Sequence, residues 1–106
     1  KCCITGMPIK ELLVASHIVP WSSDIENRLN PQNGLCLNAL HDKAFDVGLI
    51  TIDKSYCVVV ASKIEGVMEE QSKILTQYEG VKINMPSRFA PSQQFLGYHR
   101  ENVFKG

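Results

Sequence analysis

The stretch of sequence that decides the fold reads ASHIVPW (residues 15–21), NPQNGL (30–35) and HDKAFDVG (41–48). Apolar runs that stop at proline or at polar clusters are typical of short strands, and a polar run between them is typical of a loop. Asparagine before a helix and glycine after it satisfy free backbone groups at the two ends. The stretch predicts, in chain order, a strand over 12–19, a loop over 21–32, a strand over 34–37 and a helix over 39–47, capped by Asn38 and closed by Gly48.

Two histidines and one asparagine lie on these elements. His17 falls near the end of the first strand, Asn33 just before the second, and His41 in the helix. Because a hairpin packed on a short helix can bring such positions together, we expect the three side chains in one cleft. Each has a plainer interpretation when taken alone. His17 fits a buried histidine bonded to backbone, Asn33 with the following glycine fits a simple turn, and His41 fits a surface residue.

The ordered set of motifs resembles the HNH endonucleases of the ββα-metal type. The resemblance is strongest to the branch marked by SHIxPW, NPxNGL and HxxxFDxG, which here fall at 16–21, 30–35 and 41–48. The opening CCITG and the closing segment 94–104 are also similar to that branch. The resemblance implies a ββα-metal (His-Me finger) core. With the further β-hairpin and two peripheral helices that the residue patterns of the second half predict, the expected fold class is α+β. The resemblance also implies metal-dependent hydrolysis of phosphodiester bonds in DNA, within a restriction or defence nuclease.

The resemblance assigns a role to each of the three residues. His17 corresponds to the general base that takes a proton from the attacking water, a task for which imidazole is suited near neutral pH. Asn33 corresponds to the residue whose amide ties the hairpin together and helps to hold the imidazole. His41 corresponds to a ligand of one divalent metal ion, with Mg2+ expected and Mn2+, Ni2+ or Zn2+ as alternatives.

The sequence departs from the broader family at the metal ligands. Ser16 stands where Asp or His often supplies a second ligand, and a neutral hydroxyl is a poorer ligand for a hard cation than a carboxylate. Either His41 holds the ion together with water and DNA phosphate, or another carboxylate substitutes. Asp46 is the first candidate, although an ideal helix places it about 140° from His41. Asp42 is a weaker one. The paired cysteines that hold zinc in many relatives are absent.

Composition predicts one small folded domain over 1–106, with its core over about 12–48. Of the 106 residues, 44% are hydrophobic, and eleven basic residues balance eleven acidic ones. Zero net charge excludes a histone-like or arginine-rich binder and predicts weak binding to DNA. No apolar run has the length of a membrane span. Four cysteines without a CxxC pair indicate free thiols in the cytoplasm. The abrupt start predicts a C-terminal fragment whose specificity or regulatory domain lies upstream.

The second half of the chain predicts supporting structure. We expect a hairpin over 49–52 and 56–61, a helix over 65–77, an extended segment over 83–91 and a final helix over 93–104. The four phenylalanines (Phe45, Phe89, Phe95, Phe104) are assigned to the core, Trp21 to packing over the loop, His99 to a packed position and Arg100 to solvent, with phosphate contact as the alternative.

Two other classes of function stay open. The first is an HNH-like module that binds nucleic acid but has lost nuclease activity, and Ser16 is the residue that supports this alternative. The second is a zinc-stabilised structural domain, against which the missing CxxC pairs count. Metal-dependent cleavage would exclude the first, and stoichiometric zinc on thiolates would support the second.

Overall fold

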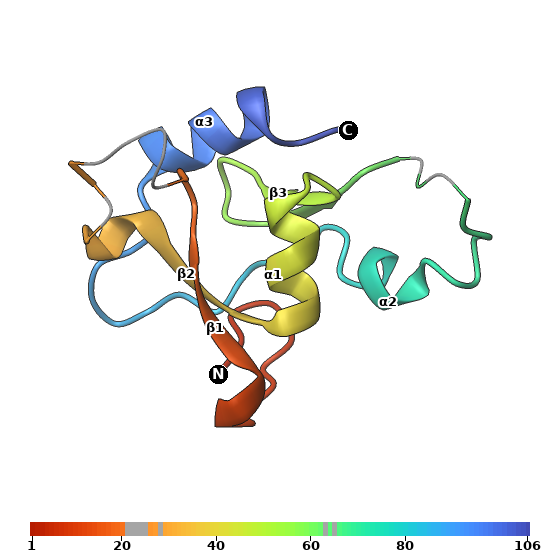
Figure 1. Ribbon diagram of the computed structural model, residues 1–106, viewed down its shortest axis with the longest axis horizontal. Helices are drawn as coiled ribbons and strands as arrows, with labels where there is room; N and C mark the ends of the chain where they lie inside the picture. Colours follow the sequence, from red (N-terminus) through yellow and green to blue (C-terminus); the bar gives the residue numbers. More distant parts are fainter. Residues whose placement is uncertain (21–25, 28, 63, 65) are drawn as a thin grey trace.

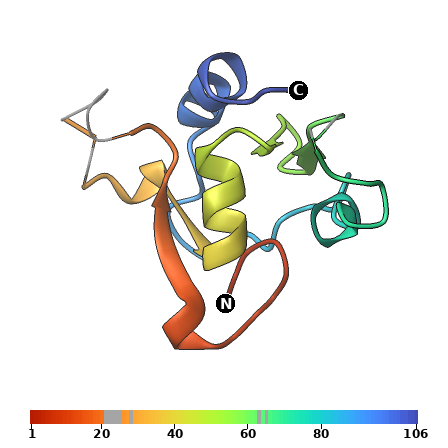
Figure 2. The ribbon, with the colours of Figure 1, turned by 45° about the vertical axis from the view of Figure 1, so that its right-hand side comes forward.

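The computed structural model describes residues 1–20, 26–27, 29–62, 64 and 66–106. It is an α+β structure with two antiparallel sheets of two strands each. Helix α1 lies at the centre, with the β1–β2 hairpin on one side, α2 on the other and α3 across its end (Figures 1 and 2). The elements are η1 (Lys10–Leu12), β1 (Leu13–His17), η2 (Pro31–Asn33), β2 (Gly34–Asn38), α1 (Ala39–Asp46), β3 (Ile50–Ile52), β4 (Val58–Val60), α2 (Lys73–Thr76) and α3 (Gln93–Asn102).

The first hairpin and α1 form a ββα unit, as the sequence predicts. β1 and β2 pair in the register from Leu13↔Asn38 to His17↔Gly34. α1 follows β2 directly and packs against both strands. Asn38 caps α1, since its Oδ1 accepts a hydrogen bond from the backbone N–H of the third helical residue, and the chain leaves the helix through Gly48 at φ +82°. Both strands, the helix and its two end residues are confirmed.

One apolar core runs through the whole structure. Phe45 of α1 is fully buried, and Phe95 of α3 also belongs to the core, so both assignments are confirmed. Phe104 is only half-buried. The assignment of Phe89 to the core is wrong, because 56% of this residue is exposed. Trp21 and half of the predicted loop over 21–32 lie outside the described residues.

The second half of the chain is partly as expected. The hairpin β3–β4 and helix α3 are confirmed, each slightly shorter than predicted. The helix predicted over 65–77 is wrong for most of its length, since the structure has turns at 66 and over 69–72 and then the four-residue helix α2. Gly66, at φ +73°, leaves the helical region there. The segment predicted to be extended over 83–91 contains no helix or strand, but it bends at 87–89, where Phe89 has φ +56°.

Two side chains of α3 fix it to α1 and β3. His99 is 1% exposed, stacks on Phe45 with 3.7 Å between ring centroids, and bonds through Nδ1 to the Thr51 hydroxyl and through Nε2 to the Phe45 carbonyl, both at 2.7 Å. Its packed position is confirmed. Arg100 donates to the carbonyl of Ile52 at 2.8 Å, so the assignment of its guanidinium to solvent is wrong. These bonds place α3 over the end of α1 and β3.

The state of the cysteines and the length of the helices bear on the predictions of free thiols and of no membrane span. All four cysteines are free thiols. In the part of the chain that the structure describes, no helix has both the length and the apolar character needed to cross a bilayer.

Candidate active site

Asn33 is a buried polar residue just before β2, and hydrogen bonds hold both ends of its carboxamide. It is fully buried at the end of η2, and its side-chain Oδ1 accepts a hydrogen bond from the Val19 N–H at 2.8 Å. Its Nδ2 donates to the carbonyl oxygens of Val19 and Asn27, both at 3.2 Å. A carboxamide satisfies this set because it carries an acceptor and two donors. Asn33 therefore joins the start of β2 to the chain two residues beyond His17.

His17 is the last residue of β1 and pairs with Gly34, the first residue of β2. The backbone of the next residue, Ile18, donates to the Asn33 carbonyl at 3.1 Å, which extends the hairpin past the strand end. His17 is half-buried and lines a cavity of about 470 Å³ together with Asn33 and Asn30. An imidazole at the rim of such a cavity can exchange protons with a molecule inside it.

His41 lies in the first turn of α1, and Asn38 determines its tautomer. The Asn38 Oδ1 accepts the backbone N–H of His41 at 2.8 Å and lies 3.0 Å from the His41 Nδ1. Since an amide oxygen only accepts, Nδ1 carries the proton and Nε2 carries the lone pair. Burial lowers the pKa of His41, which favours this neutral form. Sequence reasoning found Asn38 as a cap but missed this second role. An asparagine three residues before a histidine was the available signal.

Two orphaned atoms bear on whether these residues fit a metal ion. Within the described residues, Ser16 Oγ and His41 Nε2 are the buried side-chain polar atoms that lack a hydrogen-bond partner. A neutral imidazole with a free Nε2 is a common metal ligand, whereas a hydroxyl is a weak one. No group of three or more His, Cys, Asp or Glu side chains that could hold a metal occurs among the same residues. The described donors fit an ion that takes most of its ligands from water or phosphate.

Asp46, the other expected ligand, lies at the opposite end of α1. It is the last residue of the helix and is exposed. Burial lowers the pKa of His99, and the nearby Asp46 carboxylate opposes part of this lowering. α1 runs back alongside the hairpin, so its C-terminal end is level with the end of β1 (Figures 1 and 2). Asp46 therefore lies toward the His17 end of the unit.

The expected residues divide into two groups. His17 and Asn33 line one cavity. His41 lines another, of about 490 Å³, together with Asn38 and Tyr78, whose ring meets the His41 ring edge-on at 5.5 Å between centroids. The length of the hairpin separates the two cavities. His17 pairs with the first residue of β2, whereas α1, which carries His41, begins after the last residue of β2. The structure thus brings the predicted base and its supporting amide together, and places His41 at the other end of the hairpin.

Comparison with known families identifies the segment that contains this site. Residues 2–53 match the model of a family described as HNH endonuclease. The matched span contains the whole ββα unit and continues through β3, so all four candidate residues lie within it. No curated protein matches the chain. This half of the chain is thus similar to HNH endonucleases, and its two strands and helix are compatible with the ββα architecture.

Proposed function

We propose that this domain hydrolyses phosphodiester bonds in DNA with the help of one divalent metal ion. The observation that carries the proposal is the position of His17, which ends β1 beside a buried Asn33 in a segment similar to HNH endonucleases. We further propose that the domain is the cutting part of a restriction or defence nuclease of the cytoplasm. An upstream domain would then choose the target, which suits a chain of zero net charge.

In this proposal His17 is the general base. Its imidazole accepts a proton from the water that attacks the phosphorus atom. Asn33 is a positioning residue, because its three hydrogen bonds hold the backbone of Asn27 and of Val19, which lies two residues beyond His17. The divalent ion, Mg2+ in the first instance, would neutralise charge on the phosphate and on the leaving oxygen.

The candidate ligands of this one ion are Asp46 and His41, and the fold makes them alternatives. Asp46 offers a hard oxygen donor toward the His17 end of the unit, which suits Mg2+. His41 offers a neutral imidazole, and Asn38 sets the tautomer that leaves its Nε2 free to bind; such a donor suits Zn2+ or Ni2+. The two lie at opposite ends of α1. If Asp46→Asn loses Mg2+-supported activity and a substitution of His41 does not, the ion is assigned to the His17 end of the unit.

The experiment is nicking of supercoiled plasmid with Mg2+, Mn2+, Ni2+ or Zn2+, beside EDTA. We expect cutting that needs metal and that falls about 10²- to 10⁴-fold in His17→Ala, the usual contribution of a general base. Lys73→Ala, which changes an exposed cation on α2, is the matched control and should cut normally. Undiminished cutting by His17→Ala would refute the assigned base, and EDTA-resistant cutting would refute the metal.

A second candidate function is a binding module without turnover. Ser16 favours it, since a buried hydroxyl stands where a carboxylate ligand is common in the family, and its Oγ has no partner among the described residues. This alternative predicts DNA binding with no nicking in any of the four metals. Ser16→Asp separates the two candidates, because a restored ligand should increase cutting only if the rest of the site is competent.

A further inference from the structure

We infer that Phe89 and Arg88 form a nucleic-acid contact beside the His17 cavity, in which the Phe89 ring stacks on an unpaired base and Arg88 binds the adjacent phosphate. This inference rests on the proposed action on DNA. It adds a substrate contact in the second half of the chain, outside the span that matches the HNH endonuclease family.

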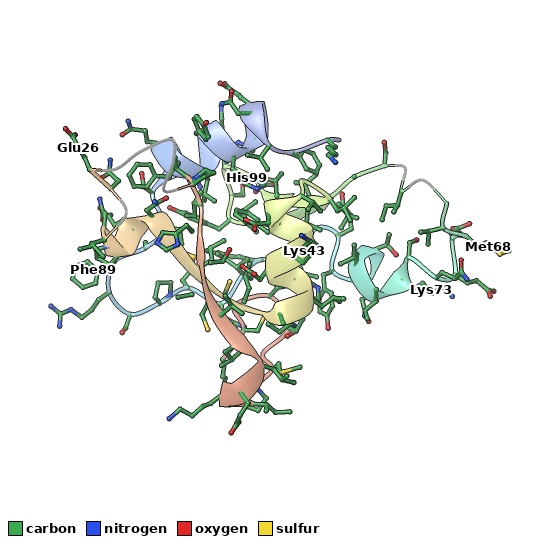
Figure 3. The ribbon with its side chains drawn as sticks, in the orientation of Figure 1. Glu26, Lys43, Met68, Lys73, Phe89 and His99 are labelled. Carbon is green, nitrogen blue, oxygen red and sulfur yellow. The ribbon has the colours of Figure 1, made fainter. Side chains whose placement is uncertain are left out.

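The first observation is the conformation of Phe89. More than half of this residue is exposed, although phenylalanine is usually buried. Its φ of +56° lies in the left-handed region, which residues with a side chain rarely adopt. Residues held in rare backbone conformations cluster at functional sites. Figure 3 shows Phe89 at the edge of the molecule next to η2, far from Met68 and Lys73.

The second observation is that this segment is held firmly. Gln32 of η2 donates through Nε2 to the Ala90 carbonyl at 3.4 Å, and its own carbonyl accepts the Ser92 N–H at 3.0 Å. The Tyr56 hydroxyl donates to the Pro91 carbonyl at 2.9 Å. The exposed ring therefore sits on a fixed backbone, which lowers the entropy lost when a ligand stacks on it.

The third observation is the charge of the adjacent cavity. Phe89 and Arg88 line a cavity of about 640 Å³, and its charged lining residues in the described chain are Arg88 and Lys1, both cations. The Arg88 guanidinium lies 5.3 Å from the centre of the Phe89 ring. An aromatic ring with cations in a groove is the usual arrangement for binding single-stranded nucleic acid, because bases stack and phosphates pair with the charges.

The fourth observation connects this cavity to the His17 cavity. Four residues, Pro31, Gly34, Leu35 and Cys36, line both. They are the first residue of η2 and the first three residues of β2, so the two cavities share this part of the hairpin as a wall. A strand with its phosphate at His17 can thus place a neighbouring nucleotide at Phe89. The contact requires an unpaired base, since base pairs in a duplex are stacked on both faces.

The test measures affinity for a labelled 12-nucleotide single strand by fluorescence anisotropy, in EDTA and low salt so that no cutting occurs. We expect Phe89→Ala to weaken binding about 5- to 150-fold, the range for loss of one stacked base, and Phe89→Trp to restore it. Met68→Ala, which removes another exposed apolar side chain, should bind like the unchanged protein. Arg88→Ala should reduce the slope of log affinity against log salt by about 0.7, whereas Lys73→Ala should not.

An oligonucleotide with abasic sites provides the second arm. It should bind the unchanged protein more weakly than the normal strand, and Phe89→Ala should bind both alike. The inference is overturned if Phe89→Ala binds the normal strand within twofold of the unchanged protein, or if the unchanged protein binds no single strand. Plasmid nicking judges the proposed function separately, because a domain that cuts without this contact would retain metal-dependent nicking.

Discussion

Removing the Asn33 side chain should damage the fold before it damages any chemistry. Asn33→Ala deletes the three hydrogen bonds to the backbone of Val19 and Asn27. The N–H and C=O of Val19 then lose their partners in a buried place, since Val19 is 4% exposed. Each unsatisfied buried group costs about 1–3 kcal/mol, so we expect a loss of roughly 2–5 kcal/mol in the free energy of unfolding. That is a large part of the 5–15 kcal/mol that is typical of a domain.

Asn33→Asp is the informative companion, because its cost should depend on pH. One carboxylate oxygen can still accept from the Val19 N–H, but the other would face the carbonyls of Val19 and Asn27, which only accept. Burial and this repulsion raise the pKa of the new carboxyl in the folded state above the ordinary value of about 3.9. A raised carboxyl pKa makes the cost largest at neutral pH. The cost then shrinks as pH falls toward the unfolded value, where the protonated acid can donate as the amide did.

Urea unfolding of the three proteins from pH 4 to pH 8 measures both effects. The difference between Asn33→Asp and the unchanged protein cancels the titration of all other groups. We expect this difference to narrow toward pH 4, while that of Asn33→Ala stays constant. A loss below about 0.5 kcal/mol in Asn33→Ala, or a pH-independent difference for Asn33→Asp, would contradict the geometry on which the proposed site rests.

Substitutions at Asn38, His99 and Gly48 test other parts of the structure. Asn38→Ser keeps a cap for α1 but leaves the His41 Nδ1–H without an acceptor, which should lower the free energy of unfolding by about 1–3 kcal/mol. Asn38→Ala also removes the cap and should lower it by about 1 kcal/mol more. Equal urea midpoints for the two variants would show that the cap contributes nothing. Burial lowers the pKa of His99 below its unfolded value of about 6.5, so stability should fall from pH 7 to pH 5 as the unfolded chain takes up the extra proton. His99→Gln should flatten that trend in thermal melts, and an unchanged slope would exclude His99 as its source. Gly48→Ala should cost well over about 2 kcal/mol in urea unfolding, because its φ is +82° and a Cβ there would overlap the Val103 carbonyl oxygen. Gly80→Ala, at φ +79° in open space, should cost only about 1–2 kcal/mol, and similar losses for the two variants would rule out the steric contact.

The sequence predicted best where local chemistry and packing agree. The cap at Asn38 and the left-handed Gly48 fix both ends of α1 without help from distant residues, and both were predicted. His99 was predicted to pack because its position on the apolar face of α3 determines its burial. Its bonds to Thr51 and Phe45 were not predictable, since they join residues 48 and 54 positions apart.

The wrong predictions were made from residue type or composition, which do not contain the backbone conformation or the packing that decides the outcome. Helical composition over 65–77 did not suffice, because Gly66 turns the chain away and the helix that follows is only one turn long. Phe89 was assigned to the core by residue type, but its backbone conformation leaves it exposed. For the site, the motifs located four candidate residues in order along the chain. Only the direction of α1 against the hairpin shows that His41 and His17 belong to different cavities.

The attachment of α3 has a consequence for how the domain opens. His99 bonds to the end of α1, and the Lys105 N–H donates to the Gly48 carbonyl at 2.9 Å. The last residues of the chain therefore bond to the C-terminal end of α1, which lies about fifty positions earlier in the sequence. Amide protons of α1 should then exchange with solvent only when α3 detaches, in one cooperative opening. The rate at which α1, the helix that carries His41 and Asp46, opens is thus set by α3 and the residues after it, which contribute no group to the proposed chemistry.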